Sequence, residues 1–409
     1  MRDLIFLSHR IPFPPDKGEK IRAWHILRQL ARTHRIHLGC FVDDPADWAH
    51  LPELRAHCAD VACFGLDRGR QKLLSLARLR PGQPLTPGYF QDARLQRWTD
   101  AKRAAGIDRA FVYCSAMAPY LTGAHGVRRV LDMVDMDSAK WADYAARARW
   151  PARAVWAREA RTLLAFERLA ALDYDRTLFV SQAEAADFAR AAPEAAGRVG
   201  WLDNGVDLGH FAPAGYERPF PPGPTIVFTG TMDYWPNVDA MTWFAADVLP
   251  RLRASRPGLR LCIVGANPAP EMRRLARDPA VIVTGRVADV RPYLAHADVV
   301  VAPLRSARGI QNKVLEAMAM GRPVVATPQA FAGLRCVAGR DLLVGADAAG
   351  FAACAGAVLD GRHAGLGGAA RAAMVAGHDW TATLAGLAAL FDAPAVPAPA
   401  ARVLGEAAP

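Results

Sequence analysis

Three cations and one carboxylate lie close together in the final third of this 409-residue chain. Arg305 and Arg308 occupy a polar segment, and Lys313 and Glu316 follow in a stretch of helical periodicity that opens at Gly309. The first N–H groups of a helix have no partner within it and attract anions. A phosphate at this helix end, with sugar hydroxyls on Glu316, would fit these residue types. The alternative is a solvated helix face with incidental charges.

Two strands and a helix are expected to position these side chains. Gly321 and Pro323 are typical of a helix end. Val314, Leu315 and Met318 fall on the helix side that would pack on a sheet, whereas the cation and the carboxylate of the helix fall on the other. The expected elements, in order, are strand 298–302, loop 303–308, helix 309–320 and strand 323–327.

A second group of chemically active residues follows the predicted strand 129–133. Asp132, Asp135 and Asp137 lie at its carboxyl end, where open parallel sheets bind ligands. These carboxylates could hold an acceptor, take the proton of its hydroxyl, or bind a metal. The alternative is a capping cluster, with Asp137 or Ser138 as the N-cap of the next helix. Asp135 is our functional candidate.

Predicted strands and helices alternate through the chain in two runs. The turn-forming pair Asn204–Gly205 and a proline-rich stretch at 213–224 separate the runs. This organisation predicts an α/β protein of two domains, as the chain length also does. The expected divisions are an N-terminal domain at 1–203, a linker at 204–224, a C-terminal domain at 225–375, a terminal helix at 376–392 and a disordered tail at 393–409.

Composition and charge limit the classes of partner. A net charge of +10 and a pI near 9.5 favour acidic partners such as nucleotide phosphates or anionic lipids. We expect no nucleic-acid partner, because no DNA- or RNA-binding motif is present. The seven cysteines include no CxxC pair, which favours reduced thiols. The sequence has neither a signal peptide nor an apolar run of the roughly 20 residues that span a bilayer, so we expect a cytoplasmic protein, soluble or peripheral on the inner face of the membrane.

Two basic helical stretches could contact a membrane surface. Residues 68–80 form an amphipathic pattern of leucines against arginines and a lysine, which suits an anionic membrane. Residues 138–172 are expected to be helical with a break at Trp150. They carry Trp141 and Trp156 among several cations, which suits a membrane interface. The alternative for both is ordinary packing on their own domain.

Several common enzyme classes are excluded by missing motifs. No GxGxxG follows a predicted strand, which argues against a nicotinamide or flavin enzyme. Neither a GxxxxGK[ST] loop nor a GxSxG elbow is present. We therefore expect no cofactor.

The helix predicted at 309–320 also resembles that of a known family. The stretch KVLEAMAMGRPVVA is similar to the donor-site helix of family 4 retaining glycosyltransferases, which have the GT-B fold. Asn204–Asp207, followed by Phe211 and Pro213, resembles the interdomain motif of that family. Residues 230–237 and the segment SHRIPFPPDKGEKIR resemble a bacterial subgroup of exopolysaccharide assembly, closest to the sugar transferases associated with PEP-CTERM/exosortase systems. The resemblance covers nearly the whole chain.

The resemblance implies a fold and a division of labour. Two Rossmann-like domains would face each other with their parallel sheets across a central cleft. The first domain would bind the acceptor and the second the nucleotide sugar, and the terminal helix would cross back to the first domain. GT-B enzymes characteristically need no bound catalytic metal, so we expect no metal ligands.

It also implies roles for individual residues. Gly18, flanked by Lys17, Lys20 and Arg22, would bring a charged loop to the donor diphosphate, although a lone glycine there also suits a tight turn. The missing side chain of Gly230 would let a phosphate come close. The expected catalytic residues are Asp135, Arg308 and Lys313. The expected donor-binding residues are Gly18, Gly230, Arg286, Val287, Arg305, Gly309, Ile310, Gln311, Asn312 and Glu316.

We therefore expect transfer of a sugar from a nucleotide diphosphate sugar to a glycan or a polyprenyl-diphosphate-linked acceptor, with retention, in exopolysaccharide biosynthesis. The family usually has two glutamates separated by seven residues. Glu316 fits the second of them, but Arg308 stands where the first would fall. This departure motivates one rival, a non-catalytic protein that senses nucleotides or polysaccharides. A second rival is a nucleotide-sugar epimerase of the same fold.

Overall fold

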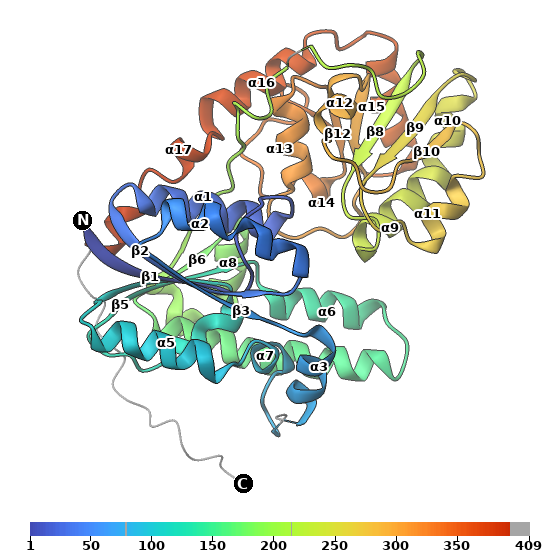
Figure 1. Ribbon diagram of the computed structural model, residues 1–409. Coiled ribbons are helices and arrows are strands. Elements are labelled where there is room, and N and C mark those ends of the chain that lie inside the picture. The colour runs from blue at the N-terminus through green and yellow to red at the C-terminus, as the bar shows by residue number, and fades with distance from the viewer. Residues whose placement is uncertain (78–79, 214, 393–409) are drawn as a thin grey trace. The chain divides into compact units, whose positions relative to one another are not determined.

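The computed structural model describes residues 1–77, 80–213 and 215–392, which divide into two compact units. The N-terminal domain holds residues 1–202 together with 384–392, and the C-terminal domain holds residues 203–383 (Figure 1). The tail at 393–409 lies outside the described residues, as do residues 78–79 of the predicted helix 68–80.

The N-terminal domain is built on a parallel sheet, as predicted. Among the described residues its strand order is β3-β2-β1-β4-β5-β6-β7. Ile5, Val112 and Leu131 from the central strands are fully buried, because a parallel sheet is covered on both faces. The strands are β1 (Arg2–Ser8), β2 (His34–Val42), β3 (Asp60–Gly65), β4 (Arg109–Tyr113), β5 (Arg128–Val134), β6 (Arg176–Phe179) and β7 (Val199–Trp201).

Helices cover both faces of this sheet, with α1 and α2 on one side and α5 and α7 on the other (Figure 1). The predicted long helix broken at Trp150 is the pair α6 and α7, whose Trp141, Tyr144 and Trp156 rings pack together. The helices are α1 (Gly18–Ala31), α2 (Leu51–His57), α3 (Arg68–Ala77), α4 (Leu85–Tyr89), α5 (Ala93–Ala104), α6 (Asp137–Arg147), α7 (Ala152–Asp173) and α8 (Gln182–Ala191).

The C-terminal domain repeats the same topology with the order β10-β9-β8-β11-β12-β13, again all parallel. Its strands are β8 (Thr225–Thr229), β9 (Arg260–Val264), β10 (Val281–Val283), β11 (Val299–Ala302), β12 (Val324–Ala326) and β13 (Leu343–Val344). Its helices are α9 (Trp235–Trp243), α10 (Leu249–Arg253), α11 (Pro270–Leu275), α12 (Arg291–Ala295), α13 (Asn312–Ala319), α14 (Pro328–Phe331), α15 (Ala348–Leu359), α16 (Leu366–Gly377) and α17 (Trp380–Thr383).

Both sheets reverse their strand order at one point. The reversal falls between β1 and β4 in the N-terminal domain and between β8 and β11 in the C-terminal domain. Ligands of doubly wound sheets bind beyond the carboxyl ends of the strands at such a switch point. The loops after these four strands, and after the adjacent β5, are therefore the places to look for a site.

Residues 376–392 are not one continuous helix. The backbone N–H of Val206 donates to His378 O at 2.7 Å, and this contact separates α16 from α17. A short 3₁₀ segment, Ala388–Phe391, then packs on the N-terminal domain. There Arg128 donates to Leu390 O at 3.1 and 3.2 Å, and the carboxylate of Asp392 lies 3.1 Å from the guanidinium of Arg109.

Candidate functional site

Lys313 is the centre of the arrangement at the C-terminal switch point. It belongs to the first turn of α13, and its Nζ donates a 2.7 Å hydrogen bond to Asn237 Oδ1 on α9. The same ammonium lies 4.2 Å from the ring centroid of Phe228 on β8, a cation–π contact. Asn237 is itself held, because its Nδ2 donates to Thr231 O at 2.8 Å. Three elements therefore fix the position of one charge.

Gly230 makes room for this pair. A Cβ at position 230 would lie 2.7 Å from Asn237 Nδ2 and 2.9 Å from Lys313 Nζ, closer than real Cβ contacts. A Cβ at Gly265 would lie 1.6 Å from Gly230 O, so the neighbouring turn also needs glycine. The space over Gly230 that we expected a phosphate to use is thus lined by the lysine and the asparagine.

Glu316 shares the partly buried face of α13 with Lys313. Burial lowers the pKa of Lys313 to about 7, and the Glu316 carboxylate acts in the opposite direction. Burial likewise raises the pKa of Glu316 to about 7, opposed by Lys313. A phosphate at this place would favour the charged lysine, because an opposite charge within a few ångströms stabilises the ammonium.

The loop before α13 corrects one expectation. The helix begins at Asn312 and not at Gly309, because Gly309 has φ +63° and cannot continue a right-handed helix. Ile310 is buried, and Gln311 precedes the helix and donates from Nε2 to Arg308 O at 3.0 Å. The helix start carries no side-chain cap. The Val314 N–H already donates to Gln311 O at 2.9 Å, so the earlier N–H groups, those of Asn312 and Lys313, are the ones that an anion could use. Arg308 lies partly buried in this loop.

Arg305 and Asn312 are tied to other segments of the C-terminal domain. The Arg305 guanidinium donates twice to the Asp239 carboxylate, at 3.0 Å from Nε and through a second, shorter bond from Nη2. Its charge is therefore already matched by an acid on α9. Asn312 Oδ1 accepts a 2.9 Å bond from Asn204 Nδ2, so the predicted interdomain motif is anchored at the start of α13.

Arg286 and Val287 lie farther along the same sheet. They follow β10, two strands from β8, in a loop that turns at Gly285 with φ +71°. Arg286 is exposed and Val287 partly buried. This loop is a separate part of the candidate site, on the far side of β9.

In the N-terminal domain, two of the three cations around Gly18 are held in buried ion pairs, whereas Lys17 is partly exposed. Gly18 is the first residue of α1. Lys20 is 2% exposed and its Nζ lies 2.7 Å from Asp47 Oδ2, whereas Arg22 is fully buried. Arg22 donates to the Asp132 carboxylate at 2.9 and 3.2 Å and to Leu202 O at 2.7 Å. Both charges are used inside the domain, because a buried cation needs a partner.

The three aspartates around the end of β5 have different surroundings. Asp132 is the buried partner of Arg22, so its role is structural. The chain then turns sharply at Val134, whose φ of +68° is rare for a β-branched residue, and the strand pairing is irregular there. Such strain is concentrated at functional sites. The turn presents Asp135. Asp137 opens α6, and the residue before the helix, Met136, provides no side-chain cap, so neither Asp137 nor Ser138 is the expected N-cap.

Asp135 lies among other acids. Its Oδ1 atom is buried with no hydrogen-bond partner among the described residues. Burial raises the pKa of Asp135 to about 7, helped by Glu184 and Asp137. Glu184 accepts the Met136 N–H at 3.0 Å. Nearby, burial raises the pKa of Glu167 to about 8, although its carboxylate accepts two bonds from Ser138. An unpartnered oxygen on an acid that titrates near neutrality can accept a proton or a hydroxyl.

Two residues of the switch points were missed by sequence reasoning. Asn237 was not among the expected site residues, although it lies inside the 230–237 motif and bonds Lys313. His9, which follows β1, has its ring 5.8 Å from Tyr113 and 5.4 Å from Phe90, and burial lowers its pKa to about 4. The signal for His9 was its place directly after the first strand of the sheet.

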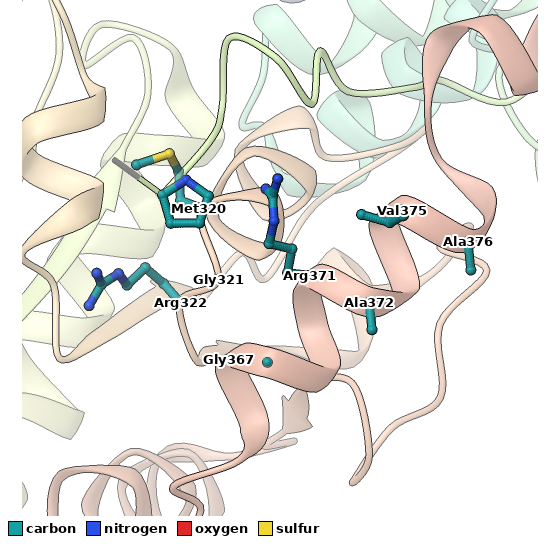
Figure 2. Close-up of a pocket in the computed structure, with 10 residues that line it drawn as sticks. Met320, Gly321, Arg322, Gly367, Arg371, Ala372, Val375 and Ala376 are labelled. Carbon is teal, nitrogen blue, oxygen red and sulfur yellow. The ribbon is translucent and has the colours of Figure 1, made fainter. Parts of the chain in front are cut away.

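A cavity of about 570 Å³ lies at the other end of α13, away from Lys313. Figure 2 shows Arg371 rising from α16 beside Met320, with Gly321 and Gly367 below them. Arg371 donates to the carbonyls of Ala319 and Phe211, so it satisfies the C-terminal end of α13. Small and apolar residues line most of this cavity together with Arg322 and Arg371, and Arg371 is already bonded to the two carbonyls.

Within the described residues, no group of three or more His, Cys, Asp or Glu side chains is arranged to hold a metal ion. In the same part of the chain, no helix combines the length and the apolar character that crossing a membrane requires.

Comparison with known proteins agrees with this geometry. Residues 223–360 match the family described as "Glycosyl transferases group 1". This segment contains Gly230, Asn237, Lys313 and Glu316. The C-terminal domain is thus a group 1 glycosyltransferase domain, and the prediction that the chain is a glycosyltransferase is confirmed. No curated protein matches the chain in sequence.

Solved structures resemble the chain over nearly its whole length. Sucrose-phosphate synthase from Thermosynechococcus elongatus has a TM-score of 0.68 at 17% identity, over 96% of this chain and 98% of that one. HepE from Anabaena in complex with UDP-glucose has a TM-score of 0.67 at 16% identity, over 96% and 100%. WaaG, a glycosyltransferase involved in lipopolysaccharide biosynthesis, has a TM-score of 0.62 at 15% identity, over 95% and 99%. These likenesses confirm the predicted GT-B fold of two Rossmann-like domains.

Proposed function

We propose that the protein transfers a sugar from a nucleoside diphosphate sugar to a hydroxyl of a glycan or a lipid-linked acceptor, in exopolysaccharide assembly. The observation that carries the proposal is the Lys313–Asn237 pair beside the uncapped start of α13, at the switch point of a group 1 domain. This is the arrangement that holds a phosphate beyond a parallel sheet.

In this proposal, the C-terminal switch point stabilises the leaving group. Negative charge develops on the nucleoside diphosphate as the glycosidic bond breaks. Lys313, Arg308 and the N–H groups at the start of α13 would be aimed at that charge. Fixed donors of this kind commonly contribute about 3 kcal/mol each to the transition state. Glu316, one turn farther along the helix, would hold the ribose hydroxyls.

The remaining donor-site residues have supporting roles. Gly309, Ile310 and Gln311 would offer their backbone to the phosphates, and Asn312 would hold the loop in place through Asn204. Arg305 would reach a phosphate only after releasing Asp239. Arg286 and Val287 would hold the nucleotide base, and Gly230 would admit the diphosphate.

We assign the acceptor hydroxyl to Asp135. Its unpartnered Oδ1 would accept the hydroxyl hydrogen, and a pKa near 7 suits a group that takes a proton at neutral pH. The configuration at the sugar would be retained, because the acceptor hydroxyl would attack the face from which the nucleoside diphosphate departs. The leaving phosphate would hydrogen-bond this hydroxyl, and the proton would end on Asp135. This proposal needs no enzyme nucleophile and no metal.

The donor nucleotide is best supported as a uridine diphosphate. HepE was solved in complex with UDP and with UDP-glucose, and another structure of the same fold holds UDP-2-fluoro glucose. The resemblance of residues 230–237 and of the N-terminal segment to the PEP-CTERM/exosortase-associated transferases supports the exopolysaccharide role.

Product analysis tests the proposal. The protein is incubated with UDP-glucose and an extract of polyprenyl-diphosphate-linked glycans, and the products are separated by mass spectrometry. Transfer gives free UDP and an acceptor heavier by one hexose. An isomerised donor without UDP release would favour an epimerase. Donor binding with neither product would favour a sensing protein, the rival suggested by Arg308 in place of the family glutamate.

We further propose that the protein works on the cytoplasmic face of a membrane. The turn between α6 and α7 presents Trp150, whose surface is 84% exposed, and three arginines with no acid lie between Tyr144 and Arg158. On α3, Leu73 is 71% exposed beside Arg70 and Lys72. An exposed tryptophan among cations suits an anionic lipid surface, where a lipid-linked acceptor would be found.

Vesicle sedimentation tests this membrane contact. The protein should sediment with vesicles that contain phosphatidylglycerol and not with phosphatidylcholine alone. Trp150→Ala should reduce the bound fraction, whereas Trp201→Ala, which removes another exposed tryptophan of the same domain, should not. Equal loss in both variants, or no sedimentation of the wild type, would contradict the proposal.

A further inference from the structure

Two cysteines far apart in the sequence meet on neighbouring strands of the N-terminal sheet. Cys40 lies in β2 and Cys63 in β3, and the two residues are register partners of the parallel pair. Their Sγ atoms are 3.3 Å apart. Neighbouring strands lie about 4.7–4.9 Å apart, within the range of Cα separations that a disulfide bridges. Both cysteines are free thiols in this structure.

The two thiols differ in exposure. Cys63 is partly exposed on β3, the edge strand of the sheet, whereas Cys40 is fully buried beneath it. The contact between the two thiols lowers the pKa of Cys63, helped by Arg55 and opposed by burial. The same contact, together with burial, raises the pKa of Cys40. A partly exposed thiol in contact with a buried second thiol is the pattern of redox-active cysteine pairs.

We propose that Cys40 and Cys63 are a modification site that closes to a reversible disulfide when the protein meets a peroxide. The Cys63 thiolate attacks hydrogen peroxide, the O–O bond breaks, and hydroxide leaves and is protonated to water. Cys63 is then a sulfenic acid. The Cys40 sulfur displaces its hydroxyl as a second water, and the S–S bond forms. Two thiols lose two electrons and two protons, and one peroxide is reduced to two waters.

A third thiol provides the internal comparison. Cys58 ends α2, shortly before β3, and burial raises its pKa to about 12. It should therefore remain a thiol while Cys63 reacts. The cross-strand contact selects Cys40 as the second partner, because that pair already lies in register.

Peptide mapping after trypsin digestion distinguishes the two possible disulfide partners of Cys63. Cleavage after Arg35, Arg55 and Arg68 places Cys40 in peptide 36–55 and both Cys58 and Cys63 in peptide 56–68. The full-length protein is treated with hydrogen peroxide, blocked with an alkylating agent and mapped without reductant. We expect the two peptides to be joined, with a mass two hydrogens below their sum, and dithiothreitol to release them. Fragmentation should place the link on Cys63.

Three results would overturn the proposal. A loss of two hydrogens within peptide 56–68 alone would mean a Cys58–Cys63 bond. Sulfinic or sulfonic acid on Cys63 without a link would mean that Cys40 does not reach it. Alkylation of all three thiols after peroxide would mean that the pair is inert. The wild-type map decides among these without any variant.

Two variants sharpen the assignment. Cys58→Ser should still give the joined peptides, whereas Cys40→Ala should leave a sulfenic acid on Cys63 that dimedone traps. Failure of the link in Cys58→Ser, with the far-UV spectrum unchanged, would assign the second partner to Cys58 and contradict the proposal.

Discussion

The two domains share one topology, but the functional candidates at their switch points carry opposite charges. At the C-terminal switch point the functional candidates are cations, Lys313 and Arg308, beside a helix start. At the N-terminal switch point the nearby cations Lys20 and Arg22 form buried ion pairs, and the acidic oxygen that has no hydrogen-bond partner there, among the residues that the structure describes, is Asp135 Oδ1.

This difference indicates how one fold can divide a transfer reaction. A diphosphate needs positive charge that is held in place before it arrives, and the Asn237 bond does this for Lys313. A hydroxyl needs an acceptor for its proton, which a carboxyl titrating near 7 provides. In the proposed reaction, the same strand order would therefore serve a charged donor in one half and a neutral hydroxyl in the other.

Removing the cation of the C-terminal half should have the largest effect. We expect Lys313→Ala to lower kcat by about 100-fold or more, because a fixed charge on the leaving group is lost. Steady-state kinetics of UDP release measures it. Arg273→Ala, which removes an exposed cation on α11 of the same domain, is the matched control. Unchanged kinetics in Lys313→Ala would remove the phosphate role of this half.

Removing the Asp135 carboxyl of the N-terminal half should lower kcat without weakening nucleotide binding. We expect Asp135→Asn to reduce kcat by about 100-fold while UDP binding stays the same. In the wild type, kcat should rise as the pH increases through about 7, because Asp135 must lose its proton to accept another. The variant should lack this rise. A parallel loss of UDP affinity would place Asp135 on the donor instead.

The buried acids should also make the N-terminal domain sensitive to pH. The pKa of Glu167 is raised from 4.5 to about 8, so the folded domain holds a proton that the unfolded chain releases. The contribution of Glu167 to the free energy of unfolding is therefore complete below about pH 4.5 and is lost as the pH rises to about 8. Glu167→Gln should flatten this fall, on the order of a few kcal/mol in unfolding free energy. Calorimetry from pH 5 to 9 that shows equal slopes for both proteins would contradict it.

The smallest effect should come from the surface pair of the C-terminal half. Asp239→Asn releases the Arg305 guanidinium, and we expect UDP affinity to rise by about two- to fivefold at low salt, the range of an exposed ion pair. Arg305→Ala should lower affinity by a similar factor. Titration calorimetry with UDP decides, and an Asp239→Asn protein that binds UDP more weakly would mean that the ion pair positions the site.

The sequence predicted the fold from signals that act locally. Apolar runs such as 298–302, closed by glycine or proline, gave the parallel strands and the two-domain alternation. The start of α13 was misplaced by three residues, because Gly309 reads as a helix start in sequence and as a left-handed turn in three dimensions. The helix after Gly230 begins at Trp235, so Asn237 lies inside it.

The side-chain partners could not be predicted in the same way. Lys313 and Asn237 are 76 residues apart, and Arg22 and Asp132 are 110 apart. Nothing in the spacing of Lys20 and Arg22 distinguishes a buried cation from one that faces a ligand. The same is true of Cys40 and Cys63, which only the strand register brings together. Local patterns therefore identify the residues that can act, and tertiary pairing decides which of them are already engaged.

Thermal unfolding with a panel of UDP, GDP, ADP and CMP, on the wild type and on Lys313→Ala, tests the central claim most directly. A nucleotide at 100 times its dissociation constant adds about 2.7 kcal/mol to the folded state, which is readily seen as a higher unfolding temperature. We predict that UDP stabilises the wild type and fails to stabilise the variant. Equal stabilisation of both proteins, or of neither by any nucleotide, would contradict the placement of the diphosphate at the start of α13.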